Sequence, residues 1–176
     1  MLLKPLINDF VSEVKSSAKI ELYNEAGLRH ELVSFLERKL PADLYGIQIE
    51  REAQAVVLEA SHPVFEAANL DIYIFERTGK GQFCLQILAQ SHHNLFSWAE
   101  ALKQIKFLEQ LSSHGFQECG LFFACQRHDF LSEPESALKN SLLGYAVKWE
   151  ELLPASQDNN DPWKYFFILL NPATKI

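Results

Sequence analysis

Alternating apolar residues near the middle of the chain predict a β-hairpin. Leu70, Ile72 and Ile74 alternate with other residues at a period of two, which is typical of a strand. A second alternating stretch begins at Phe83, and residues 77–81 between the two include glycines that favour a tight turn. Because both faces of this hairpin are largely apolar, we expect it to lie mid-sheet with both faces covered.

Helical spacing of apolar residues predicts two long helices. The first spans residues 7–40 with a break near Ser16–Ser17, and Pro41 ends it. The second spans residues 95–111, and Gly115 shortly after it is typical of a helix C-terminus. Each helix carries an apolar face, so each is expected to pack that face on a sheet.

Further strands are predicted on either side of the second helix. One strand is expected at residues 45–57, and the fully apolar run at residues 120–125 indicates a buried strand. The C-terminal part is predicted to add a short helix at residues 133–140 and late strands or edge elements at residues 145–152 and 164–170.

The order of these elements indicates one α/β domain. A helix, three strands, a helix and a strand follow one another, and a C-terminal extension comes last. This order suits a mixed central sheet flanked by helices. With 176 residues, of which 48% are hydrophobic, the chain is long enough for a single domain with a substantial core.

Charge and cysteine content narrow the functional class. The formal net charge is −7, which disfavours nucleic-acid binding because the phosphate backbone calls for a basic surface. Cys84, Cys119 and Cys125 lie in apolar stretches without zinc-ligand spacing, which predicts reduced, buried thiols in a cytoplasmic protein. No apolar run approaches the ~20 residues that span a bilayer, so no membrane association is expected.

Two acidic residues stand out against apolar surroundings. Asp71 is a lone acid in a buried-looking strand, and ionised Asp is rarely buried without a partner. It either marks a site, or pairs with a nearby Arg or caps a turn. Glu25 lies beside the apolar stripe of the first helix. It either leans over the sheet or forms an i,i+4 ion pair with Arg29, worth ~0.3–0.5 kcal/mol.

Four stretches of sequence, taken in order, carry a resemblance to a known fold. They are YNEAGLRHELVSFLERKLPADLYGIQIER (23–51), LDIYIF (70–75), IKFLEQLSSHGF (105–116) and an aromatic tail with Trp149 and Trp163-Lys164-Tyr165. Together they resemble a group of uncharacterised bacterial proteins in the PD-(D/E)xK nuclease-like superfamily. The resemblance implies a single domain over residues 1–176. Its restriction-endonuclease-like core, α-β-β-β-α-β, would cover about residues 20–126, with a C-terminal extension over about residues 127–176.

The resemblance also implies a site. In active members the second strand carries a metal-binding Asp, the third carries Glu-x-Lys, and an acid from the first helix often completes the site. Mg²⁺ prefers such oxygen ligands, and the metal activates a water while Lys helps to position the nucleophile. Position by position, Asp71 matches the Asp, Glu25 matches the helix acid, and Gln86 and Leu88 match the Glu-x-Lys positions.

Gln86 and Leu88 depart from the family motif. Gln offers a neutral carbonyl without charge, and Leu offers neither charge nor hydrogen bond. Losing one transition-state contact typically costs ~10²–10³ in rate. We therefore expect a catalytically inactive domain that needs no cofactor and acts by binding an unidentified partner, with a protein as the candidate. Leu88 is then expected to be buried against the first helix, over a closed site.

The alternative is a Mg²⁺-dependent nuclease that hydrolyses phosphodiesters at a rearranged site. Asp71 and Glu25 would hold Mg²⁺ or Mn²⁺ there. Glu50 could add a second acid, and Lys103 or Lys106 could reach over the sheet from the second helix. Against this, both lysines fit the solvated side of an amphipathic helix.

Overall fold

The computed structural model describes residues 1–16, 24–57, 65, 67, 69–79, 81–89, 98–126, 149–151 and 163–170. Its helices are α1 (Leu3–Ser16), α2 (Glu25–Lys39), α3 (Ala53–Val56) and α4 (Trp98–Ser113). Its strands are β1 (Tyr45–Glu52), β2 (Asn69–Glu76), β3 (Gln82–Ala89), β4 (Glu118–Gln126), β5 (Trp149–Glu151) and β6 (Trp163–Leu170). Within these ranges, no helix combines the length and the apolar character that crossing a membrane requires.

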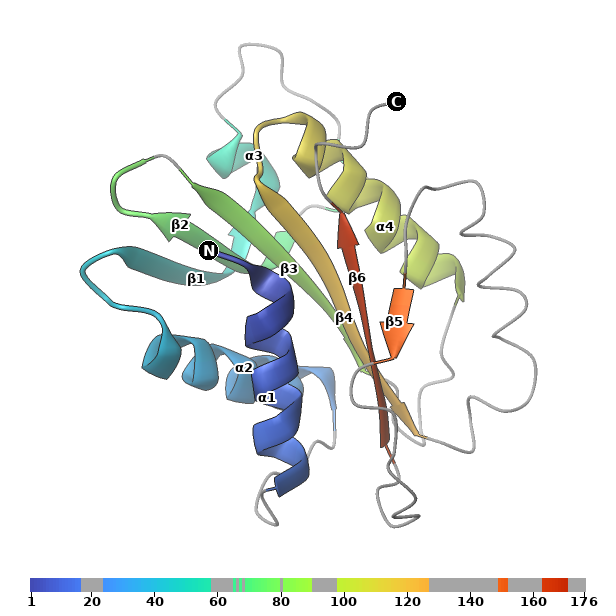
Figure 1. The fold of residues 1–176 in the computed structure, drawn as a ribbon. Helices are drawn as coiled ribbons and strands as arrows, with labels where there is room; N and C mark the ends of the chain where they lie inside the picture. The colour runs from blue at the N-terminus through green and yellow to red at the C-terminus, as the bar shows by residue number, and fades with distance from the viewer. Residues whose placement is uncertain are drawn as a thin grey trace.

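The six strands form one mixed sheet in the order β1-β2-β3-β4-β6-β5. Strands β3 and β4 are parallel, and the other neighbours are antiparallel. Helix α4 lies between β3 and β4 along the chain, as parallel neighbours need a crossover connection. Figure 1 shows α1 and α2 on one face of the sheet and α4 on the opposite face. The predicted α/β architecture, a mixed sheet flanked by helices, is confirmed.

Each face of the sheet carries its own hydrophobic core. The α2-side core joins α1 and α2 to strand residues that include Ile72, Ile74, Leu85, Ile87 and Phe122. The α4-side core joins α3 and α4 to strand residues that include Leu70, Tyr73, Cys84, Leu121 and Phe123. Successive residues of a strand point to opposite faces of the sheet. The core to which a strand residue belongs therefore shows the face to which its side chain points.

Helix α1 is fixed to the sheet at its first residue and along its buried face. The Leu3 N–H donates to Oε2 of Glu118 at 2.7 Å, and Glu118 is buried at the start of β4. A carboxylate at a helix N-terminus accepts a hydrogen bond from an amide that has no partner within the helix. Its negative charge also interacts favourably with the positive end of the helix dipole. Further along α1, Phe10 packs edge-on against Phe35 of α2 and Phe122 of β4. Helix α1 is thus an integral part of the domain.

The central hairpin forms as predicted. Strands β2 and β3 pair antiparallel, and Gly79 in the turn between them takes a positive φ of 75°, which glycine adopts without a steric penalty. The three cysteines, Cys84, Cys119 and Cys125, are buried free thiols, as expected.

Some predicted boundaries were wrong. The strand expected at residues 45–57 ends at Glu52, and Ala53–Val56 is a helical turn. The expected break in the first helix is confirmed, because α1 ends at Ser16 and α2 begins at Glu25. The short helix expected at residues 133–140 lies outside the described residues.

The C-terminal extension belongs to the same sheet as the core. Strand β6 pairs with β4 at eight positions, from Cys119–Leu170 to Gln126–Trp163, and β5 pairs with β6 at the edge. Four successive side chains of β6, Tyr165 to Ile168, are buried. The late strand expected at residues 164–170 is therefore an interior strand covered on both faces.

Candidate functional site

The regular alternation of β2 breaks at Asp71. Leu70 belongs to the α4-side core, whereas Ile72 and Ile74 belong to the α2-side core. In an uninterrupted strand, residues 70 and 72 would share a face. The pairing of β2 with β3 runs from Phe75 to Ile72 and stops there. The strand thus shifts its side-chain phase by one residue at Asp71, where its ladder with β3 ends.

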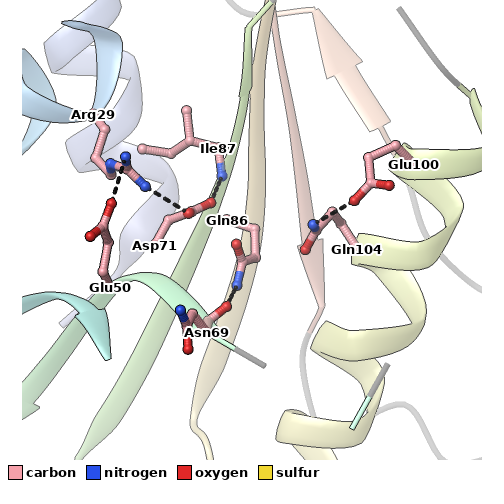
Figure 2. Close-up of polar contacts among 8 residues, drawn as sticks. All are labelled: Arg29, Glu50, Asn69, Asp71, Gln86, Ile87, Glu100 and Gln104. Carbon is pink, nitrogen blue, oxygen red and sulfur yellow. Dashed lines mark hydrogen bonds and ion pairs between the residues drawn. The ribbon is translucent and has the colours of Figure 1, made fainter. Parts of the chain in front are cut away.

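The shift turns the Asp71 side chain toward helix α2. Its Oδ2 accepts the Ile87 N–H at 2.8 Å, and its Oδ1 accepts Nη1 of Arg29 at 3.0 Å. Figure 2 shows Arg29, Glu50 and Asp71 together on one side of the strands, and Glu100 and Gln104 of α4 on the other. The Asp71 carboxylate therefore accepts a hydrogen bond that a backbone carbonyl of β2 would accept in a regular sheet. Both of its oxygens accept hydrogen bonds.

Arg29 joins Asp71 to a third strand. Its Nη2 lies 2.9 Å from Oε1 of Glu50, a β1 residue whose side chain is 60% exposed. Glu50 has a φ of 51° and is the one non-glycine residue with positive φ in the described part of the chain. The left-handed region is uncommon for a residue with a Cβ, and such residues cluster at functional sites.

Glu25 reaches the same place from the start of α2. The Asn24 side chain caps the helix by accepting the Gly27 N–H at 2.8 Å, a role for which Asn is among the preferred residues. The Glu25 carboxylate accepts a hydrogen bond from the Ala89 backbone. Glu25 therefore leans over the sheet, and its charge interacts with that of Asp71. The two residues proposed as metal ligands are therefore close enough for their charges to interact.

Burial shifts both acids in the same direction. Desolvation raises the pKa of the Asp71 carboxyl, although the hydrogen bond from Ile87 and the Arg29 guanidinium oppose the shift. Desolvation, and then the negative charge of Asp71, raise the pKa of Glu25, while Arg29 and the Ala89 hydrogen bond oppose it. Arg29 therefore favours the ionised form of two carboxyl groups, whereas burial favours their protonated form.

Carboxyl titration by ¹³C NMR tests this electrostatic picture. We expect Asp71 and Glu25 to titrate above their ordinary values of 3.8 and 4.5, and Arg29→Met to raise both midpoints further. Because a raised pKa means that the folded state binds protons more tightly, these groups favour folding most below their ordinary values. That contribution is lost as the pH rises through the folded-state values. A midpoint of Asp71 at or below 3.8 would contradict this account.

Gln86 and Leu88 point away from this cluster. Cys84 before them belongs to the α4-side core, and Leu88 packs against that core, whereas Leu85 and Ile87 belong to the α2-side core. Gln86 is 1% exposed, and its Nε2 donates to the Asn69 carbonyl at 3.0 Å. The expected convergence of Asp71, Gln86 and Leu88 is wrong, because the phase of β2 shifts at Asp71 and that of β3 does not.

The expected burial of Leu88 against the first helix is wrong for the same reason. Leu88 is partly exposed and lies on the α4 side of β3. The β3 residues that share a face with Asp71 are Ile87 and Ala89, which pack into or against the α2-side core.

The groups considered for a rearranged site separate in the structure. Glu50 reaches the cluster through Arg29. Lys103 and Lys106 are exposed on α4, which fits the solvated helix face expected of them, and Lys103 lies 3.9 Å from Glu100. Gln104 also donates to Glu100, at 3.0 Å, from the face opposite Asp71.

Arg29 is the site residue that sequence reasoning undervalued. The sequence pattern indicated Arg29 only as an i,i+4 partner of Glu25, and it indicated only an unspecified arginine as a partner of Asp71. The signal that could have found it is its spacing of one helical turn from Glu25, which places both side chains on one side of α2. That it also reaches strands β1 and β2 depends on the tertiary arrangement.

The arrangement does not fit a divalent metal of the kind that the resemblance implies. Both oxygens of Asp71 accept hydrogen bonds from Arg29 and Ile87, and the neighbouring β3 positions on that face carry apolar side chains. Across the described residues, no three His, Cys, Asp or Glu side chains form a group that could hold a metal ion.

Comparison with protein-family models, curated proteins and solved structures finds no significant match to the chain.

Proposed function

We propose that the chain is a restriction-endonuclease-like domain of the PD-(D/E)xK type that has no nuclease activity and acts by binding a protein partner. The order α2, β1, β2, β3, α4 and β4 supports the fold assignment, with α3 as a short insertion after β1. The placement of an acid on the second strand, beside an acid from the preceding helix, supports the position of the ancestral site.

The β3 face beside Asp71 is the observation that carries this proposal. A working site of this type would present Glu and Lys there, one to bind the metal and one to act on the nucleophile. Ile87 and Ala89 occupy that face and belong to or pack against the α2-side core. Their side chains can neither bind Mg²⁺ nor stabilise a developing negative charge. Phosphodiester hydrolysis therefore lacks two of its required groups.

The charge of the site favours a protein partner over nucleic acid. Glu50 and Asp71 form ion pairs with Arg29, the charge of Glu25 interacts with both Arg29 and Asp71, and the whole chain carries a net charge of −7. An acidic surface repels phosphates and lacks the counterion-release term that drives nucleic-acid binding. The alternative, a metal-dependent nuclease, draws on one observation, the approach of Glu25 to Asp71.

Cleavage and binding assays on the purified chain test the proposal. We expect no cleavage of plasmid, linear duplex or single-stranded DNA, or of RNA, with Mg²⁺ or Mn²⁺. We also expect no mobility shift of duplex DNA at physiological salt, for the electrostatic reason above. Asp71→Asn serves as the control for contaminating nucleases. Metal-dependent cleavage by the wild type that Asp71→Asn abolishes would establish the nuclease alternative instead.

A further inference from the structure

Arg29 occupies the centre of the acidic cluster with both of its terminal nitrogens engaged. Nη1 lies 3.0 Å from Oδ1 of Asp71, and Nη2 lies 2.9 Å from Oε1 of Glu50. The Arg29 and Asp71 side chains are each 18% exposed, whereas that of Glu50 is 60% exposed. One guanidinium therefore bridges carboxylates from two strands, with most of its contact to Asp71 shielded from water.

A guanidinium suits this position better than other side-chain cations. It remains protonated at any physiological pH, and its planar fork presents donors to two acceptors at once. Helix α2 carries Arg29 one turn after Glu25, so the same guanidinium also lowers the pKa of the Glu25 carboxyl. One positive charge from the chain itself thus acts on all three carboxyl groups.

We propose that Arg29 is the resident cation of this site and excludes divalent metal ions from it. This inference rests on the proposed function and adds the residue that enforces it. A divalent cation bound between Asp71 and Glu50 would have to displace the guanidinium and would be repelled by it. Removing the charge of Arg29 leaves carboxylate oxygens of Asp71 and Glu50 without their cation, and such oxygens are the ligands that Mn²⁺ and Mg²⁺ prefer.

The left-handed backbone of Glu50 supports this assignment. Glu50 and Asp71 both fall between the paired residues Ile49–Ile72 and Arg51–Leu70, so irregular backbone on β1 lies beside the phase shift on β2. The two irregularities place a carboxylate from each strand on the same guanidinium. Strained backbone persists where surrounding contacts determine it, and here those contacts meet at Arg29.

Mn²⁺ binding by calorimetry, with the Mn²⁺ electron paramagnetic resonance signal as a second readout, tests the proposal. We expect Arg29→Met to bind Mn²⁺ at least about tenfold more tightly than the wild type, because a repelling unit charge is removed within a few ångströms of the ligands. Adding Asp71→Asn to Arg29→Met should abolish the gain. Arg38→Met is the matched control, since it removes another arginine of α2 that pairs with a glutamate, Glu13 of α1, and it should leave Mn²⁺ affinity unchanged.

Arg29→Gln keeps the test decisive if the methionine variant does not fold. Its amide can still donate to Asp71 without carrying charge, and it should gain Mn²⁺ affinity as well. A folded Arg29→Gln or Arg29→Met variant with wild-type Mn²⁺ affinity would overturn the proposal, as would tight Mn²⁺ binding by the wild type. Failure of this proposal is distinguishable from failure of the proposed function, which is decided by nucleic-acid cleavage by the wild type.

Discussion

Leu85→Ala is expected to destabilise the domain by ~2–5 kcal/mol, whereas Leu88→Ala should cost only about 1 kcal/mol. Leu85 is completely buried in the α2-side core, beneath helix α2 and beside Ile87. Truncating it removes buried methyl groups and leaves a cavity that close-packed neighbours fill only in part. Leu88, three residues further along β3, is partly exposed at the border of the α4-side core, so less packing is lost.

Equilibrium unfolding in urea measures both free energies on the same strand. Exposed Ile49→Ala is the control for a generic loss of side-chain volume in the sheet, because Ile49 is 56% exposed, and it should change the free energy of unfolding by about 0.5 kcal/mol or less. Equal costs for Leu85→Ala and Leu88→Ala would mean that both leucines are core residues. That result would contradict the partial exposure of Leu88 at the border of the α4-side core.

The periodic parts of the fold were predictable because burial alone determines them. The alternation around Ile72 and Leu85 gave the hairpin, and the apolar run at residues 120–125 gave β4. The end of β1 at Glu52 was missed because a single helical turn has too few residues to show a period of 3.6. The interior position of β6 was missed because pairing between strands distant in sequence leaves no local signal.

The site was predicted in its members more than in its geometry. Asp71 and Glu25 were identified as unusual because charge in apolar surroundings requires a partner. Their partner, Arg29, and the role of Glu50 depend on how three elements meet. Gln86 and Leu88 were placed with Asp71 on the assumption that β2 and β3 alternate without interruption. A phase shift of one residue exchanges the two faces of a strand, and no residue type in LDIYIF indicates such a shift.

The face to which Asp71 points has a direct consequence for function. With Asp71 held by Arg29 and Ile87, the carboxylate stabilises the junction of β1, β2, β3 and α2. The residue that would bind metal in an active nuclease thus links β2 to β3 beyond the point where their backbone pairing stops. Under the proposed function, the exposed Glu50 is the part of the cluster that a partner would contact first.

Arg29→Met should also reduce stability by ~1–3 kcal/mol, because it leaves the carboxylate of Asp71 buried without its cation. The value is below the ~3–5 kcal/mol typical of fully buried pairs, since both side chains retain 18% exposure. Asp71→Asn should cost less, because an amide oxygen can still accept the Ile87 N–H. Once Asp71 is neutral, most of the penalty for losing Arg29 should disappear.

A double-mutant cycle between Arg29→Met and Asp71→Asn tests most directly the claim that Arg29 holds Asp71 on the α2 side of the sheet. Urea unfolding of the wild type, both single variants and the double variant should give a coupling energy of ~1–2 kcal/mol. The matching cycle of Lys103→Met with Glu100→Gln, an exposed pair at 3.9 Å, should give less than about 0.5 kcal/mol. A coupling between Arg29 and Asp71 no larger than that of the exposed pair would contradict the account.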